Sequence, residues 1–190
     1  MTVPNFTCLN NAEFDIIVGS TRIFRIRNVI DDTPEAITCI LHNLTMRTFI
    51  TFSKDEIRIW DEAEGKRVQT FANLFTDDEI SVACLDDRNR KVITGTQKGK
   101  IAVFNCLNGA LMKEGKSHNS YVSGLLYVSE ARCVISTSWD RTLRVYYEEP
   151  QDELLLIREV RNAHKRDITC LEYSERLRLI FTGEQTVHIL

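Results

Sequence analysis

Short segments that alternate apolar and polar residues run along the whole chain, and tight polar turns separate them. The pattern is clearest in the apolar-rich segments 122–128, 133–137, 142–146 and 154–160, which are divided by turns such as Ser138-Trp-Asp-Arg141. An alternation with a period of two is typical of a strand with one packed face. No helical period of useful length occurs, so the pattern predicts units of four short antiparallel strands.

The same unit recurs along the chain. Its first strand begins at Ile37, Ile80, Val122 and Ile168, which are 43, 42 and 46 residues apart, and a degenerate copy runs from Phe6 to Ile26. Repeats of this length that hold four strands are typical of a β-propeller, in which each repeat forms one blade. In the other copies we expect second strands at 48–52, 91–94 and 177–182, and third strands at 57–60, 101–104 and 186–190.

The repeat predicts an all-β protein with a single partial propeller over residues 1–190, made of about four four-stranded blades and most of a fifth. The approximate blade ranges are 6–35, 36–78, 79–120, 121–166 and 167–190. Because the last copy stops inside its third strand, we expect an incomplete ring with unpaired strand edges, which favour association. Such a chain would be a truncated product, a fragment, or a half that is closed by another chain or a missing segment.

Composition narrows the class of protein. With 43% hydrophobic residues the chain can build a sizeable core, and its net charge of -3 argues against a protein that mainly neutralises phosphates. The N-terminal residues lack the basic and apolar regions of a secretory signal, and no stretch approaches the roughly 18 apolar residues of a membrane span. We therefore expect a cytosolic or nuclear protein with no membrane partner.

The six cysteines fit the repeat better than a metal site. Cys8, Cys39 and Cys170 each lie two residues after the start of their copy, where Val82 and Gly124 stand in two other copies. A position filled by Cys, Val or Gly is expected to be a small, buried strand position. No two cysteines are closer than 22 residues, so we expect structural thiols in a reducing compartment.

Three segments resemble the WD-repeat family of β-propellers. They are Ile57-Arg-Ile-Trp-Asp61, Ser138-Trp-Asp-Arg-Thr-Leu-Arg-Val-Tyr146, and Ala163-His164 just ahead of Ile168-Thr-Cys-Leu171. The resemblance implies a rigid, non-catalytic scaffold for protein–protein interaction. From the absence of a secretory signal and a membrane span we expect it in the cytoplasm.

The resemblance also implies a structural network in each blade. In the family a His before the first strand, a Ser or Thr in the second, an Asp in the following turn and a Trp in the third are joined by hydrogen bonds. No copy here has all four. The matching residues are His118, His164, Asp55, Asp140 and Trp60, with Ser136 or Ser138 as the hydroxyl for His118, Thr182 for His164, and Tyr146 in place of a Trp.

The turn 138–142 and the segment 163–171 are also similar to large WD-repeat proteins of cilia and flagella. This similarity implies a second function, a structural component of an axonemal or cytoskeletal assembly, with ciliary or cytoskeletal localisation. Some of those proteins carry EF-hands, and no EF-hand loop occurs in this sequence.

No arrangement of residues indicates catalysis. The pairs Asp31-Asp32, Asp77-Asp78 and Asp86-Asp87 could serve acid–base or metal chemistry, but each falls at a turn, where Asp commonly binds backbone N–H groups. The segment Gly95-Thr-Gln-Lys-Gly99 lacks the Ser or Thr and the helix of a phosphate loop. His42 and His188 have no metal-like partner at short spacing. We expect no enzyme activity, no metal and no cofactor.

The turn between the second and third strands opens, in the WD-repeat family, on a face that often docks partners. Trp139 lies in that turn beside Arg141, and a Trp near an Arg is typical of a binding hot spot, although Trp139 could equally cap its own blade. Lys54, Gln97 and Gln185 lie in the corresponding turns and would complete the face. Nucleic-acid binding through Arg22, Arg25 and Arg27, or through Lys165 and Arg166, is a weaker alternative, because these residues also fit solvated positions.

Overall fold

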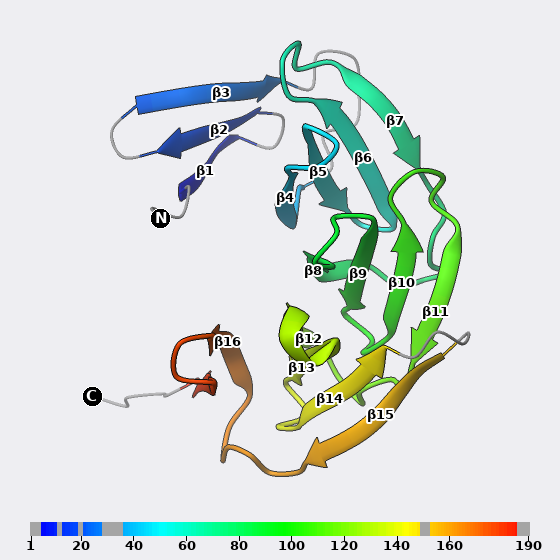
Figure 1. Ribbon diagram of the computed structural model, residues 1–190, viewed down its shortest axis with the longest axis vertical. Coiled ribbons are helices and arrows are strands. Elements are labelled where there is room, and N and C mark those ends of the chain that lie inside the picture. Colours follow the sequence, from blue (N-terminus) through cyan, green and yellow to red (C-terminus); the bar gives the residue numbers. More distant parts are fainter. Residues whose placement is uncertain (1–4, 11–12, 19–20, 28–35, 149–152, 186–190) are drawn as a thin grey trace.

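The strands form sheets that follow one another along an arc (Figure 1). The computed structural model describes residues 5–10, 13–18, 21–27, 36–148 and 153–185, and the side chains from residue 36 onward within these ranges. Within the described residues the one helical segment is a 3₁₀ turn, η1 (Ser129–Ala131). The predicted all-β fold with an incomplete ring is confirmed, because the arc stays open between its two ends.

Three consecutive blades carry four antiparallel strands each. The first consists of β4 (Cys39–Asn43), β5 (Thr48–Ser53), β6 (Glu56–Asp61) and β7 (Arg67–Phe71). The second consists of β8 (Ile80–Leu85), β9 (Lys91–Thr96), β10 (Ile101–Asn105) and β11 (Leu111–Gly115). The third consists of β12 (Val122–Val128), β13 (Cys133–Ser138), β14 (Leu143–Glu148) and β15 (Glu153–Val160). In each blade the strands pair in chain order, so the first strand lies at the centre of the arc and the fourth at its rim.

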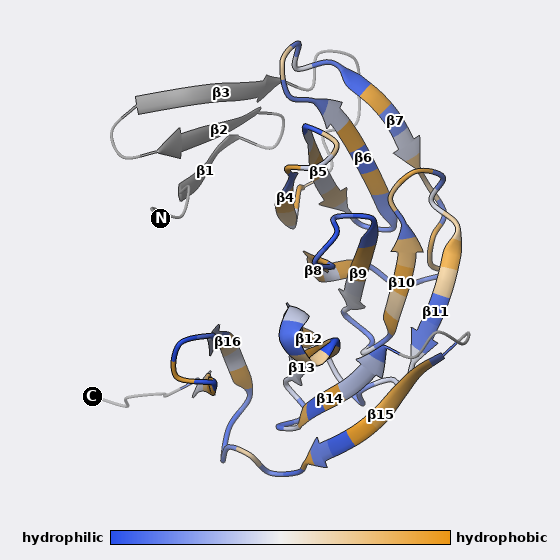
Figure 2. Ribbon diagram, viewed as in Figure 1, coloured by the Kyte–Doolittle hydropathy of each residue, from blue (hydrophilic) through white to orange (hydrophobic). Residues whose placement is uncertain are grey.

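The second and third blades also touch at their rims. Strand β11 pairs in parallel with β15 through Glu114 opposite Glu153 and Gly115 opposite Leu154, which joins the two blades into one eight-stranded sheet. The segment 154–160, expected from its pattern to be a strand, lies within β15, which pairs with β14 as well. Hydrophobic and hydrophilic residues alternate along the strands (Figure 2), as expected for blades with packed faces.

Shorter sheets lie at both ends of the arc. At the N-terminal end β1 (Asn5–Asn10), β2 (Glu13–Val18) and β3 (Thr21–Arg27) form a three-stranded sheet. At the C-terminal end β16 (Ile168–Ser174) and β17 (Leu179–Glu184) form a hairpin. The expected third strand of that copy, 186–190, lies outside the described residues, as do Asp31-Asp32 and His188.

The core lies between neighbouring blades. One hydrophobic cluster joins the first and second blades through residues such as Phe52, Ile80 and Phe104. Another joins the second and third blades through residues such as Ile93, Val122 and Tyr146. Burying one such side chain stabilises the fold by roughly 1.5–3 kcal/mol. Blades also approach closely, since a Cβ added to Gly95 would lie 2.6 Å from Cγ1 of Val122 in the next blade.

The C-terminal hairpin is much less covered than the same part of the other blades. The second strands β5 and β13 are buried at all six positions, whereas β17 is exposed at Leu179, Ile180 and Phe181. Cys170 on β16 is exposed, so the prediction of a buried thiol is wrong at this position, because no described sheet packs against this side of the hairpin. The other described cysteines are half-buried or buried free thiols, and burial raises the pKa of Cys39 to about 12.

Candidate interaction face

The turn after the second strand of each blade is tied by a backbone hydrogen bond to a neighbouring loop. In three blades the N–H of the turn residue donates to the carbonyl just before the first strand: Gln97 to Glu79 at 2.8 Å, Trp139 to Tyr121 at 3.0 Å and Gln185 to Asp167 at 3.0 Å. Lys54 holds the same place in the first blade, where its carbonyl accepts from Ile80 at 2.6 Å. These turns share one end of their blades, and we call the surface around Lys54, Gln97, Trp139, Arg141 and Gln185 the interaction face.

Trp139 is the large apolar side chain of this face. It is 44% exposed and stacks on Tyr121, with the ring centroids 4.3 Å apart and the planes inclined by 21°. Arg141 is exposed as well and adopts a left-handed backbone conformation, φ 65°, which closes the turn through a hydrogen bond from its N–H to the carbonyl of Ser138. Trp139 therefore lies above its blade rather than inside it.

A buried polar network supports the Trp139 turn from below. Nε2 of His118 lies 2.6 Å from Oγ of Ser136, and its Nδ1 lies 2.9 Å from Oγ1 of Thr142 and 3.2 Å from Oδ2 of Asp140. Asp140 accepts hydrogen bonds from the N–H of Thr142 at 3.0 Å and from that of Asn119 at 2.9 Å. The turn is thus held to the preceding loop by its side chains and its backbone together.

Burial controls the charge states in this network. Removal from water lowers the pKa of His118 to about 4 despite the nearby Asp140 carboxylate, so the imidazole is neutral at pH 7. Burial by itself would raise the pKa of Asp140, but the hydrogen bonds from Thr142 and Asn119 hold it below its usual value. The network at neutral pH consists of a neutral His and an ionised Asp.

The structure distinguishes between the two serines proposed for this network. Ser136 bonds to His118, whereas Ser138 donates its hydroxyl to the carbonyl of Ser120 at 3.2 Å. Tyr146 occupies the third-strand position of the family Trp, and its hydroxyl donates to the carbonyl of Lys116 at 2.7 Å. The blade therefore closes its network with a backbone contact in place of an indole.

The remaining predicted structural residues lie in two other blades. In the first blade Nε1 of Trp60 donates to Oγ1 of Thr51 at 2.8 Å, a buried contact, while Asp55 lies on the turn at the surface. In the last hairpin Nε2 of His164 lies 2.7 Å from Oγ1 of Thr182. These contacts match parts of the expected network, but among the described residues only the third blade joins His, hydroxyl and Asp.

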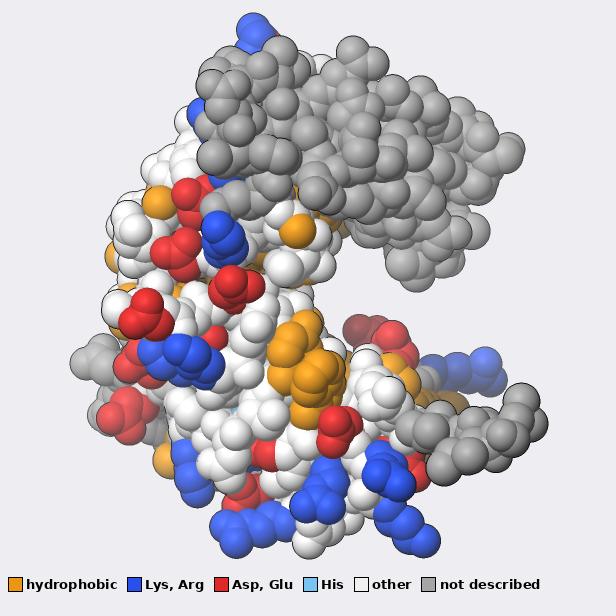
Figure 3. Space-filling view, turned by 180° about the vertical axis from the view of Figure 1, so that it is seen from behind, with side chains coloured by type: hydrophobic (Ala, Val, Ile, Leu, Met, Phe, Trp, Pro, Cys, Tyr) orange, Lys and Arg blue, Asp and Glu red, His pale blue; other side chains and the backbone are white. Residues whose placement is uncertain are grey.

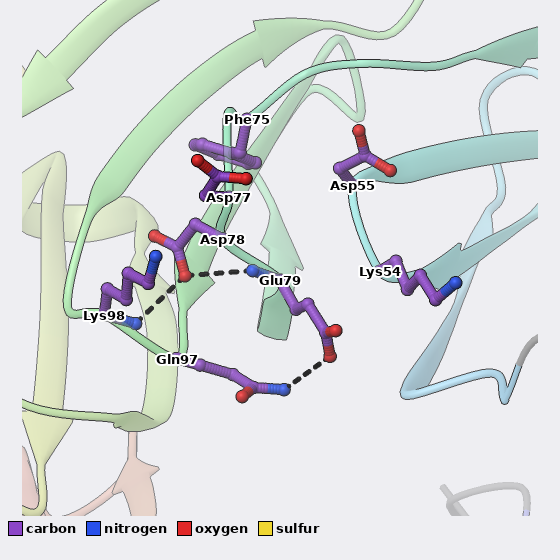
Figure 4. Close-up of a pocket in the computed structure, with 8 residues that line it drawn as sticks. All are labelled: Lys54, Asp55, Phe75, Asp77, Asp78, Glu79, Gln97 and Lys98. Carbon is purple, nitrogen blue, oxygen red and sulfur yellow. Dashed lines mark hydrogen bonds between the residues drawn. The ribbon is translucent and has the colours of Figure 1, made fainter.

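A hollow of about 480 Å³ opens on the interaction face between the first two blades (Figure 4). Two residues predicted for binding, Lys54 and Gln97, line it. The other lining residues are Asp55, Phe75, Asp77, Asp78, Glu79 and Lys98. The sequence alone indicates only a turn at Asp77-Asp78. The feature of the sequence that could have indicated this hollow is the run of three acidic residues, 77–79, directly before a first strand.

Figure 3 views the arc from behind Figure 1. A patch of hydrophobic side chains lies near the middle of this side, with Lys and Arg side chains gathered below it and several Asp and Glu side chains above it. An apolar patch inside a charged surface is typical of a site that binds another protein.

Within the described part of the chain no three His, Cys, Asp or Glu side chains gather in a way that could hold a metal ion. No helix in the described segments has the length and apolar character needed to cross a membrane. Lys165 and Arg166 are exposed, and Arg22, Arg25 and Arg27 lie on β3, whose side chains are outside the described set.

Comparison with known proteins agrees with this geometry. Residues 109–146 match the family model "WD domain, G-beta repeat". The chain is 22% identical over 177 residues to "WD repeat-containing protein on Y chromosome" of Drosophila grimshawi, covering 83% of this chain and 15% of the relative. Residues 109–146 thus resemble a WD repeat, and the chain as a whole is similar to WD-repeat β-propellers. Proteins with WD repeats typically act as interaction scaffolds, and the fold is generally non-catalytic.

Two further similarities are informative. "Cilia- and flagella-associated protein 337 B" of Tetrahymena thermophila is 24% identical over 110 residues, covering 58% of this chain and 9% of the relative. The solved WD40 propeller domain of Doa1 superimposes with a TM-score of 0.73 at 14% identity, covering 91% of this chain and 54% of that domain. The chain thus spans a small part of the curated relatives and about half of the solved propeller.

Proposed function

We propose that this WD-repeat chain is a non-catalytic protein–protein interaction scaffold in the cytoplasm and that its partner docks on the interaction face around Trp139. The observation that carries the proposal is the exposed indole of Trp139, stacked on Tyr121 at the end of a rigid blade. Aromatic side chains that present a large apolar area with little freedom to lose are typical hot spots. Arg141, Lys54, Gln97 and Gln185 would contribute contacts around it.

Rigidity of the turn supports this role. The Trp139 turn is fixed by its backbone bond to Tyr121 and by the Asp140 bonds to Asn119 and Thr142. A side chain that is already ordered loses little conformational entropy on binding, so more of its contact energy contributes to affinity.

The test compares two exposed apolar residues. Trp139→Ala should weaken capture of co-purifying proteins by the tagged full-length protein by roughly tenfold or more, as measured by quantitative mass spectrometry, because a hot spot contributes about 2 kcal/mol. Leu155→Ala is the matched control, since Leu155 is 49% exposed but lies on the rim strand β15.

The thermal unfolding midpoint separates the possible roles of Trp139. An unchanged midpoint with reduced capture supports the interaction face. A lower midpoint together with an equal loss of capture would assign Trp139 to its blade. Unchanged capture would remove Trp139 from the binding site.

The exposed C-terminal hairpin favours a second candidate function, a structural component of an axonemal or cytoskeletal assembly. Leu179, Ile180 and Phe181 expose apolar surface where other blades are covered, and a neighbouring chain or a further segment could close the ring there. The ciliary name of one relative points the same way. Localisation of the tagged full-length protein to cilia would support this candidate, and a diffuse cytosolic signal would support the adaptor.

A further inference from the structure

The hollow between the first two blades has a distinct chemistry. Its wall carries the carboxylates of Asp55, Asp77, Asp78 and Glu79, against the two ammonium groups of Lys54 and Lys98. In Figure 4 Lys54 points away from the carboxylates, whereas the ammonium group of Lys98 points toward Asp78. The hollow is therefore acidic, with an excess of two negative charges among its lining side chains.

Asp78 is the unusual residue of this set. Its side chain is only 6% exposed, and its Oδ1 accepts hydrogen bonds from the N–H groups of Glu79 at 2.9 Å and Lys98 at 3.0 Å. The other oxygen, Oδ2, is buried and has no hydrogen-bond partner among the described residues. A buried carboxylate oxygen without a donor is costly, so the site favours an additional N–H donor.

We propose that the hollow receives an arginine side chain from the protein that docks on the interaction face. Arginine fits better than lysine because its planar guanidinium group offers several donors, which can serve Asp78 Oδ2 and an exposed carboxylate such as Asp77 or Glu79 at once. Phe75, whose ring centroid lies 5.9 Å from the ammonium nitrogen of Lys100, adds apolar surface to the wall of the hollow. Lys98, whose side chain is exposed, would move aside as the arginine enters.

This inference rests on the proposed function and adds the chemistry of the partner. Gln97, at the edge of the hollow, and Trp139 lie in the corresponding turns of neighbouring blades, so one partner segment could reach both. The arginine would then supply orientation and charge selectivity, while Trp139 supplies apolar contact.

The test is an NMR titration of the isotope-labelled protein with an acetylated, amidated Ala-Arg-Ala peptide. The same peptide with Lys or Gln in the middle serves for comparison. We expect the arginine peptide to shift the amide signals of Glu79 and Lys98, the lysine peptide to shift them less, and the glutamine peptide to leave them unchanged. Added salt should reduce the shifts, because the contact is electrostatic and partly exposed.

Matched variants separate the hollow from general acidity. Asp77→Asn with Glu79→Gln should weaken arginine-peptide binding about fivefold, since two partly screened charge contacts are lost. Asp87→Asn with Glu130→Gln removes two exposed carboxylates at the opposite ends of the blades and should change nothing. Asp78→Asn should abolish the shifts, because it keeps Oδ1 as an acceptor but replaces Oδ2 with a donor.

The outcomes are distinct. Equal shifts with the glutamine peptide, or wild-type binding by the Asp77 and Glu79 double variant, would overturn the proposal and leave Asp78 as a structural cap. Trp139→Ala should not alter the peptide titration. A failure of the arginine site therefore leaves the Trp139 test of the proposed function standing, and the reverse also holds.

Discussion

In the second and third blades a hydrogen bond from a backbone N–H to an Asp carboxylate joins the same two loops, but its direction is reversed. In the third blade Asp140, in the turn after the second strand, accepts from the N–H of Asn119 in the loop before the first strand. In the second blade Asp78, in the loop before the first strand, accepts from the N–H of Lys98 in the turn after the second. Lys98 stands 42 residues before Asp140, which is the spacing between the starts of the two copies. In both blades an Asp carboxylate joins these two loops, and the carboxylate comes from a different loop in each blade.

The interiors of the two blades also differ, in the polarity of the side chains below this bond. Below the bond the third blade has His118 and Tyr146, whose polar atoms are hydrogen-bonded. The corresponding positions in the second blade are Thr76, which is exposed, and Phe104, which packs edge-on against Phe75 with ring centroids 5.6 Å apart. Below this bond the third blade is thus held by a polar network and the second blade by aromatic packing. Replacing a single polar side chain below the bond should therefore destabilise the third blade more than the second.

The largest expected effect is on His118. His118→Ala leaves the Ser136 hydroxyl and the Asp140 carboxylate buried with fewer partners and opens a cavity, so the free energy of unfolding should fall by about 3–4 kcal/mol. Thr76→Ala, at the corresponding position of the second blade, should change it by less than about 0.5 kcal/mol. Denaturant unfolding of both variants measures the difference, and equal effects would contradict a division between polar and aromatic blades.

The His118 network should also make the stability of the protein depend on pH. Because the pKa of His118 is about 4 in the folded protein against an ordinary value of 6.5, the unfolded chain binds a proton between these values while the folded protein does not. Stability should therefore be lost as the pH falls from 6.5 to 4, by about 3 kcal/mol at most, at 1.36 kcal/mol for each pKa unit. The lowered pKa of Asp140 acts below the ordinary value of 3.8 for this carboxyl, outside this window.

The control for the titration is His118→Gln, which keeps hydrogen-bonding groups but does not titrate. Denaturant unfolding at pH 7, 6, 5 and 4 should give a shallower loss of stability for this variant than for the wild type. Parallel curves would mean that His118 does not carry the acid sensitivity of the blade.

The sequence repeat located most strands because each strand carries its own alternating pattern. An exception is β17, expected at 177–182, which begins at Leu179 because Arg178 turns the chain with φ 53°. The partners His118 and Asp140 could also be predicted, since the family pattern assigns both positions.

The hollow and the reversed bond could not be predicted from the repeat. Asp78 does not occupy a family position, and its contact with Lys98 depends on how the loop folds over the turn. The hollow is built from the segments 54–55, 75–79 and 97–98, which belong to two blades. A repeat period describes each blade, whereas the space between blades depends on their packing. The exposure of Cys170 could not be predicted for the same reason, because the burial of this residue depends on a neighbouring sheet.

The smallest expected effect concerns Tyr146. Tyr146→Phe makes the third blade resemble the second, where Phe104 holds this position, and it removes the hydroxyl that donates to the carbonyl of Lys116. Nη1 of Arg144 also donates to that carbonyl, at 3.1 Å, so the carbonyl keeps a partner and the free energy of unfolding should fall by only about 1 kcal/mol. Denaturant unfolding of Tyr146→Phe, of Arg144→Met and of the double variant checks this reasoning. A loss for the double variant that is no larger than the sum of the two single losses would show that Arg144 does not compensate for the missing hydroxyl.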